Sequence, residues 1–588
     1  MSTESGGVAE TTPDGFIDLS AFAPLRPAER LLVRAYLEDD IARVGWRRPV
    51  VPSDDITVRA ALVAHLARGA AERQVMPRAV QLVGAWIEGR LDLRDAHVAE
   101  SLWFYRCVFD TTLRLDGVRV NGSVSLPGCL LPGLRAEDAV ISGVLALNSG
   151  CTVRSQLRLA RAVIGDDLNF ERLQLRSAEN SDAPIHRRVS ADGARVDGNV
   201  LLCGGLESDG DLRFVGLHVA GDLRASRAQV SGGVDGDGRR GDALNLDQAR
   251  IAGSVFLDEG FSATGLVRLK QARVVGDLNC SGAAFDALGE IAWHGNTSVA
   301  LDQARIGGTL VLAKQAQPLQ GVSLASAKAG ALADDATTWG EQITLDGFSY
   351  SRYARHAPTD ARFRVDWLMR QPSAHLDRDF RPQPWQQVIR VLRDGASHAA
   401  ARDVAVARER HLRRVGRVGA GLPRALASLA RTGHALLGAL VGFGHRPLRL
   451  VVALAAIWLV CGAVYWAAAE QGAIGPLNPA IYNDPRLAAC REAAAPAQAP
   501  NWTRCASLPA EHPAFRPFAY SLDVLFPFAN LQQRQVWTAL DGHGAAVPAA
   551  AGHWGLASRM LAWTQSLFGW IALALLGWWA LRRTARAD

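Results

Sequence analysis

The sequence lacks the motifs that most cofactor-dependent enzymes carry. It contains no CxxC pair, no HExxH or GxSxG motif, and no Walker lysine motif or glycine-rich phosphate loop between a strand and a helix. Its 14 histidines are scattered along the chain. We therefore predict no catalytic residue, no metal and no cofactor, and we favour a protein that is not an enzyme.

A signal peptide is also missing. The opening residues, MSTESGGVAETTPDG, are polar and partly acidic, without the basic start and apolar stretch that direct secretion. We therefore expect the first 440 residues to stay in the cytoplasm. The net charge of +6 comes almost entirely from arginine, and the excess clusters beside two apolar segments near the C-terminus. This placement indicates membrane topology, and we predict no nucleic-acid partner.

Two long apolar segments are typical of transmembrane helices. Leu448–Ala469 carries no charge after Arg449, and Leu561–Leu581 is uncharged with tryptophan near both ends. At about 1.5 Å per residue, each segment can cross a hydrocarbon core of roughly 30 Å. The alternative is a pair of buried core helices. The residues from His434 to Gly444 are too few to span, and we expect them to lie in the membrane interface.

The arginines predict the orientation of these helices. Ten arginines lie between residues 402 and 449, and Arg582, Arg583 and Arg586 follow the second segment, whereas the connecting segment 470–560 is more sparsely basic. Positive residues favour the cytoplasmic side. We therefore predict a protein of the bacterial inner membrane with both termini cytoplasmic. The lipid bilayer is its first partner, and a homo-oligomer through the two helices stays open.

The connecting segment contains two cysteines, Cys490 and Cys505. In an oxidising periplasm they can form a disulfide, which would close a short loop and stabilise it by about 3 kcal/mol. Two unpaired thiols are the alternative. We expect the other cysteines to be reduced.

A 14-residue repeat fills much of the first 320 residues. Nine copies align without a gap, starting at Leu91, Leu113, Leu134, Leu157, Val189, Leu212, Leu244, Val267 and Val299. The first position is Leu or Val in every copy, the eighth is Val or Ile, the twelfth is Leu or Val, and the tenth is Gly in seven copies. Three columns that are apolar throughout indicate coils whose inward residues stack.

The spacing within each copy predicts strands and corners. Apolar residues alternate at period two, and the phase shifts between positions three and six, where Asp-Gly or Asp-Gln often stands. We place the glycine at position ten on the inward side, where it allows a bend or a close backbone approach. Hexapeptide and pentapeptide repeats need other periods, and leucine-rich repeats need an asparagine ladder and a helical half. The fold class that we predict is mainly β, a right-handed parallel β-helix (β-solenoid) with α-helical caps and two C-terminal transmembrane helices.

The copies start 21–23 or 32 residues apart, and the two spacings alternate after the fourth copy. We expect the extra residues, such as Arg176–Arg188 and Ser231–Asp242, to form loops along one side, where a solenoid commonly binds its partner.

The predicted domains are listed by residue number: a helical cap 1–75, the solenoid 76–350, a helical hairpin with a juxtamembrane linker 351–432, a first membrane segment with its lead-in 433–470, a periplasmic loop 471–555, and a second transmembrane helix with a basic tail 556–588.

Helices are expected at both ends of the repeat. Upstream, Pro27–Asp40 and Ser53–Gln74 have helical character, and Ser53 or Asp54 could cap the second. Downstream, Pro384–Arg414 places apolar residues at helical spacing until Gly395 and then continues as an alanine-rich helix.

Four segments together are similar to a known family. They are Gly84–Leu93, Leu246–Gly282, Phe380–Arg393 and Tyr520–Leu531. They resemble bacterial proteins with a β-helix and two transmembrane helices, which are often labelled membrane-associated oxidoreductases or uncharacterised membrane proteins. The resemblance covers most of the chain and implies the same architecture. It implies no established active site, so we carry over no catalytic residue.

Three features are candidates for function. Cys107, Cys129 and Cys151 lie one coil apart and predict a buried column of thiols, for which core packing is more plausible than a metal or redox site. Arg250, Arg273 and Arg305 share position seven and predict an outward column, either a solvated face or a strip for an anion or an acidic partner. The third is Tyr520–Leu531, which we expect to pack on the outer leaflet; in a channel, Asp523 would be its only ionic feature, and the filter sequence TVGYG is absent.

These observations favour a membrane-tethered cytoplasmic scaffold that binds a protein partner whose identity is unknown. An enzyme with a site on the loop face, as the oxidoreductase label implies, is the first alternative. A channel-like assembly of two-helix subunits is the second.

Overall fold

The computed structural model describes residues 11–12, 15–16, 19–69, 78–177, 187–233, 241–286, 297–444, 446, 448–491, 501–509, 511–526, 528–540 and 549–584. The chain divides into two compact units, Met1–Val404 and Ala405–Asp588.

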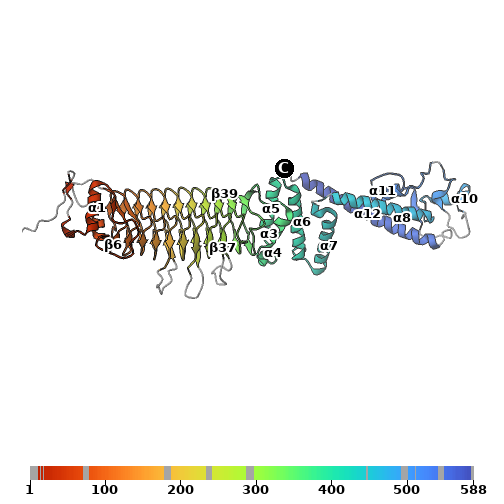
Figure 1. The fold of residues 1–588 in the computed structure, drawn as a ribbon. Coiled ribbons are helices and arrows are strands. Elements are labelled where there is room, and N and C mark those ends of the chain that lie inside the picture. The colour runs from red at the N-terminus through yellow and green to blue at the C-terminus, as the bar shows by residue number, and fades with distance from the viewer. Residues whose placement is uncertain are drawn as a thin grey trace, which may run out of the picture. The chain divides into compact units, whose positions relative to one another are not determined.

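The first unit is built on three parallel sheets of 10, 21 and 10 strands (Figure 1). Each of the seven copies from Leu113 to Val267 contributes short strands to all three. In the copy that starts at Leu244, these strands are β30 (Asp242–Asn245), β31 (Arg250–Ile251), β32 (Val255–Phe256) and β33 (Ser262–Thr264). They pair in parallel with β34 (Leu266–Arg268), β35 (Arg273–Val274), β36 (Leu278–Asn279) and β37 (Ala284–Asp286) of the next copy.

The register between copies follows the sequence repeat. At position eight, Val219 is the Cα partner of Ile251, and Ile251 is the partner of Val274. These side chains are at most 3% exposed, so the column lines the interior. The register predicted from the alignment is therefore confirmed, and inward residues of each coil pack on those of the next.

Two kinds of corner shape each coil. Position five has a positive φ, 68° at Gly117 and 58° at Gln271, as the phase shift predicted. Position ten differs from the prediction, because its glycine lies at a partly exposed corner and not on the inward side. A Cβ on Gly253 would lie 2.2 Å from Oδ1 of Asp222 in the preceding coil. That oxygen accepts the backbone N–H of Ser254 at 2.9 Å, so the glycine leaves room for a side chain that links the coils.

The stack continues beyond the nine aligned copies. Two further coils contain β40 (Val322–Ser323), β41 (Lys328–Ala333), β42 (Ile343–Thr344) and β43 (Ser349–Tyr353). At the other end, β5 (Val80–Val83) pairs with β8 (Leu102–Tyr105). We call residues 80–353 the parallel stack.

The N-terminal end has two helices, α1 (Pro27–Glu38) and α2 (Ala60–Ala67). The second is shorter than predicted, and neither Ser53 nor Asp54 caps it. Thr57–Arg59 forms strand β4, which pairs in parallel with β6 (Trp86–Glu88). The β-branched Thr57 and Val58 suit a strand, and the expected helix therefore begins only at Ala60.

The other end of the stack is followed by α3 (Ala361–Met369), α4 (Ser373–Leu376), α5 (Pro382–Asp394) and α6 (His398–Arg414). The predicted break at Gly395 between two helices is confirmed, since α5 ends at Asp394 and α6 begins at His398. Trp385 and Val388 of α5 are buried. Gln387 of α5 donates to the carbonyl of Tyr350, which fixes the helix against the last strand of the stack.

The second unit is helical. It contains α7 (Arg424–Val441), α8 (Leu448–Glu470), α11 (Pro517–Leu525) and α12 (Ala549–Thr584), with short helices α9 (Pro479–Asn483) and α10 (Ala488–Arg491). A two-stranded antiparallel sheet pairs β44 (Ile474–Pro476) with β45 (Trp537–Ala539). Two helical stretches, Leu448–Glu470 and His553–Gly577, are long and apolar enough to cross a membrane. Residues 434–441 of the predicted lead-in belong to α7.

Candidate functional site

Basic side chains form a column on one face of the parallel stack. Arg250 of β31 is the Cα partner of Arg273 of β35, which pairs with Arg305 of β39 (Arg305–Val311), which pairs with Lys328 of β41. All four side chains are exposed. Because neighbouring strands lie about 4.8 Å apart, the column carries one cation per 4.8 Å or so along the stack. We call these four residues the cationic ladder.

A groove of about 640 Å³ runs along the cationic ladder. The four cations line it together with Gln248, Gln271, Gln303 and Ser326, which stand two residues earlier in each coil. Gln271 donates to Gln303 at 3.3 Å. The groove therefore combines guanidinium and ammonium groups with neutral amides and a hydroxyl, and no carboxylate is among the residues that line it.

A second column of arginines provides the contrast. Arg135, Arg158 and Arg213 stand at position two of their copies, on another face of the coils. Each lies beside a carboxylate of the preceding coil: Asp116 at 3.4 Å, Glu137 at 3.2 Å and Asp192 at 2.8 Å, respectively. Exposed pairs of this kind contribute only about 0–1 kcal/mol each, but they neutralise the face. This column fits the solvated-face interpretation.

The cationic ladder has no such neutralisation. Across the described parts of the chain, no carboxylate lies within ion-pair distance of Arg250, Arg273, Arg305 or Lys328. In the coil before Arg250, the same position is His218, whose Nε2 lies 3.5 Å from Nη1 of Arg250. One coil further, Arg195 is paired with Asp197 at 2.8 Å. The run of consecutive cations without a carboxylate partner therefore begins at Arg250 in this column.

The other edge of the cationic ladder is apolar or small. Position nine is Ala252, Val275 and Gly307 in the coils of the three arginines. Val275 is 68% exposed, and it is the only large apolar side chain with such exposure among the described residues of the stack. A row of amides, a row of cations and a row of small or apolar residues therefore lie side by side on this face.

The cysteine column lies inside the stack. Cys107, Cys129 and Cys151 are wholly buried, and the backbone N–H of Cys107 donates to Sγ of Cys129 at 3.3 Å. Burial raises the pKa of the Cys129 thiol well above its ordinary value and that of Cys151 to about 12. Neutral buried thiols are poor nucleophiles and poor metal ligands. In the described residues no group of three His, Cys, Asp or Glu side chains is placed to hold a metal ion.

The insertions expected to form a loop face leave the stack at one corner. Each insertion connects two successive strands. The first lies between β21 (Gln174–Leu175) and β22 (Arg187–Ser190), the second between β29 (Gln229–Ser231) and β30, and the third between β37 and β38 (Val299–Ala300). All three thus connect the same two sheets. Residues 178–186, 234–240 and 287–296, on which the loop-face prediction depends, lie outside the described residues.

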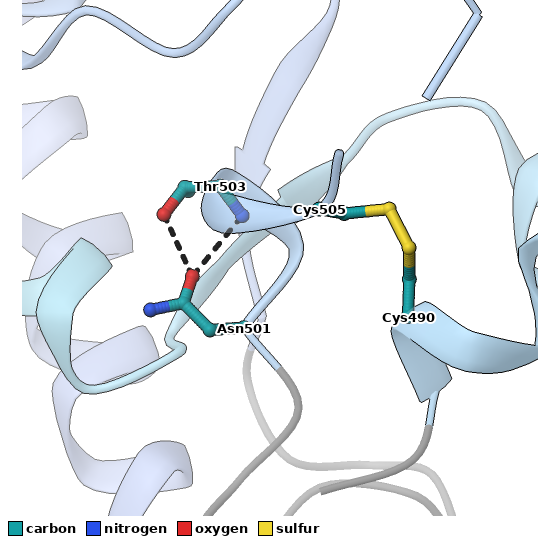
Figure 2. Close-up of a disulfide and its surroundings, with 4 residues drawn as sticks. All are labelled: Cys490, Asn501, Thr503 and Cys505. Atoms are coloured by element: carbon teal, nitrogen blue, oxygen red, sulfur yellow. Dashed lines mark hydrogen bonds between the residues drawn. A yellow bond between two sulfur atoms is a disulfide. The ribbon is translucent and has the colours of Figure 1, made fainter. Parts of the chain in front are cut away.

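In the second unit, Cys490 and Cys505 are joined by a disulfide, with their Cα atoms 5.5 Å apart (Figure 2). Local hydrogen bonds position Cys505. Oδ1 of Asn501 accepts from the backbone N–H and the hydroxyl of Thr503, at 3.1 and 2.7 Å, and starts the short helix η4 (Trp502–Arg504) that Cys505 ends. Asn501 also donates to the carbonyl of Ala469 at 2.8 Å, which ties this turn to the end of α8.

Helix α11, which belongs to the segment Tyr520–Leu531, packs against both long helices. A Cβ on Gly462 of α8 would lie 2.4 Å from the ring of Phe518, and one on Gly569 of α12 would lie 1.8 Å from the carbonyl oxygen of Leu525. Leu525 also joins a buried cluster with Leu450 and Leu454 of α8 and Ala572 of α12. Both glycines therefore permit a close approach of α11 to the two long helices.

Polar groups join the three helices. The hydroxyl of Tyr465 in α8 donates to the side-chain oxygen of Gln565 in α12 at 2.9 Å. The amide of Gln565 donates to the hydroxyl of Ser521 in α11 at 2.8 Å. That hydroxyl in turn donates to the carbonyl of Trp458 in α8 at 2.9 Å. Asp523 is 4% exposed and accepts backbone N–H groups of Leu531, Gln533 and Arg534. Its carboxylate therefore holds the chain segment that follows α11.

Sequence reasoning missed part of the site. Lys328 lies in a coil whose first and eighth positions, Val322 and Ala329, continue the repeat. The alanines and glycine of this coil replace the larger apolar residues that mark the other copies, so the repeat is hard to detect in the sequence. The recurrence of glutamine at position five in three coils is the sequence signal for the amide row of this groove. No family model, no curated protein and no solved structure matches the chain.

Proposed function

We propose that the chain is a right-handed parallel β-solenoid tethered to a bacterial inner membrane by two transmembrane helices, and that it works as a binding or scaffold module in the cytoplasm. The coil-to-coil register of three parallel sheets supports the solenoid. The two long apolar helices and the arginines beside them support the tether and the cytoplasmic position of both termini. A disulfide in the connecting segment fits an oxidising periplasm.

One observation carries the binding function, namely the absence of carboxylates from the cationic ladder. Several other arginines of the stack pair with acids of a neighbouring coil, such as Arg158 with Glu137 and Arg213 with Asp192. By contrast, four consecutive coils leave Arg250, Arg273, Arg305 and Lys328 without a carboxylate within ion-pair distance in the described structure. Like charges held about 4.8 Å apart repel each other, so the arrangement is favourable chiefly when an anion lies over it. The ladder is therefore the surface where we place an acidic partner.

Binding of a simple polyanion tests this function. Full-length protein purified in detergent should bind fluorescent poly-L-glutamate, and the triple variant R250Q/R273Q/R305Q should lose at least tenfold in affinity. The control R135Q/R158Q/R213Q changes the net charge equally on another face, and its affinity for poly-L-glutamate should stay within about threefold of that of the wild type. Equal losses in both variants would mean that net charge alone attracts the polymer and would reject the proposed site.

A second candidate is a channel-like assembly of several copies, and one observation favours it. Helix α11 packs against both α8 and α12, and the chain that follows it turns back to Asp523. A re-entrant helix between two spans is a recurrent element of ion channels. Reconstituted full-length protein would have to give unitary currents in planar bilayers, and a silent bilayer with verified incorporation would reject this candidate.

A further inference from the structure

We propose that the cationic ladder binds one face of an acidic α-helix from a partner protein, with carboxylates at positions i, i+3, i+7 and i+10 of that helix. This inference rests on the proposed binding function and names the shape and chemistry of the partner.

The spacing of the cationic ladder favours a helix. Four coils place cations at about 0, 4.8, 9.6 and 14.4 Å along the stack. A helix that rises 1.5 Å per residue places residues i, i+3, i+7 and i+10 at about 0, 4.5, 10.5 and 15 Å, within roughly 1 Å of each cation. An extended peptide presents same-side residues every 6.7 Å or so and is about 5.7 Å out of step by the fourth cation. A linear acidic peptide can therefore satisfy only part of the ladder, whereas a helix satisfies all of it.

The chemistry of the flanking rows favours an amphipathic helix. Arginine binds a carboxylate through two parallel N–H groups, and the amides of Gln248, Gln271 and Gln303 can donate to the oxygens that remain. On the other edge, the exposed side chain of Val275 and the small residues Ala252 and Gly307 offer apolar area beside the cations. A helix whose acidic stripe is bordered by apolar residues on one side matches this order of rows. A polyphosphate or a lipid headgroup would gain nothing from Val275.

Designed peptides test the inference. An alanine-rich peptide of about 20 residues, long enough to be helical, carries glutamates at i, i+3, i+7 and i+10 with leucines along one border. The control peptide has the same composition, but its glutamates stand at i, i+2, i+4 and i+6, which spreads them around the helix. We expect the first to bind full-length protein in detergent at least tenfold more tightly by fluorescence anisotropy.

Variants locate the contact. R273Q/R305Q should weaken binding of the patterned peptide roughly tenfold, as expected for the loss of two charge pairs. V275S should weaken binding of the patterned peptide severalfold more than it weakens binding of poly-L-glutamate. The affinity of the control R158Q/R213Q for the patterned peptide should stay within about threefold of that of the wild type.

The outcomes separate the inference from the function on which it rests. If both peptides and poly-L-glutamate bind equally and all three depend on Arg273 and Arg305, the ladder is an anion site but the helical partner is wrong. Vesicles of anionic lipid that bind with the same dependence and exclude the patterned peptide would also overturn the helical partner. If neither peptide nor the polymer binds, both the inference and the proposed function fail.

Discussion

Arg364 and Asp334 face each other in the interior beside the last coils of the stack, and neither side chain is exposed. Nη1 donates to Oδ2 at 2.7 Å and Nη2 to Oδ1 at 2.8 Å, while Nε donates to the carbonyl of Pro358. The guanidinium also lies over the ring of Tyr353, with Cζ 3.9 Å from the ring centre. This pair joins helix α3 to the coil that contains Asp334, and every polar atom of the guanidinium has a partner.

We predict that D334A destabilises the first unit by about 3–5 kcal/mol, because it leaves a buried guanidinium without its counter-charge. Thermal unfolding of the full-length protein in detergent measures the loss. The exposed pair Arg227–Glu259 supplies the control, and E259A should cost less than about 1 kcal/mol. Similar melting curves for the two variants would contradict the role assigned to the buried pair.

The inward column gives a second prediction. Ile251 is 1% exposed, so I251D places an unpaired carboxylate in the core and should abolish cooperative unfolding of the stack. Its neighbour Ala252 is exposed, and A252D should shift the melting temperature by only a few degrees. If I251D melted like the wild type, the register of the coils would be wrong.

The register was open to prediction because three apolar columns recur in nine copies, and Val219, Ile251 and Val274 do pair in that order. The flanking elements were harder to predict. Thr57–Arg59 reads as the start of a helix until its parallel partner Trp86–Glu88 is known, since pairing with a distant strand overrides local preference. The packing of α11 against α8 and α12 depends on Gly462 and Gly569, which resemble any other glycines of apolar helices in the sequence.

The glycine at position ten yields a third prediction. In G253A the new Cβ would meet Oδ1 of Asp222 at 2.2 Å and the carbonyl oxygen of Gly221 at 2.6 Å, so the coils must separate or the side chain must give up its hydrogen bond to Ser254. We expect a loss of about 1–3 kcal/mol in denaturant unfolding. In G241A the nearest atom lies at 3.5 Å, an ordinary contact, and this control should be nearly neutral. A neutral G253A would show that the corner has room for a side chain.

The cysteine pair of the connecting segment gives a fourth. Peptide mapping under non-reducing conditions should recover Cys490 linked to Cys505 from protein made in bacterial membranes, because the segment is expected to face the periplasm. C490S should free Cys505 for alkylation and lower the stability of the second unit by about 3 kcal/mol. Recovery of both cysteines as alkylated free thiols from the wild type would reject the bond and weaken the predicted topology.

The most direct test of the account asks on which side of the membrane the cationic ladder lies. A252C introduces an exposed thiol beside Arg250, and N483C introduces one in the connecting segment. The free cysteines Cys107, Cys129, Cys151, Cys280 and Cys461 are buried, and the partly exposed Cys203 is replaced by serine to lower the background. A membrane-impermeant maleimide is added to bacterial cells whose outer membrane has been opened. The account predicts that N483C is labelled in these cells and that A252C is labelled only after the inner membrane is disrupted. Labelling of A252C with the inner membrane intact would contradict a membrane-tethered module that presents this face to the cytoplasm.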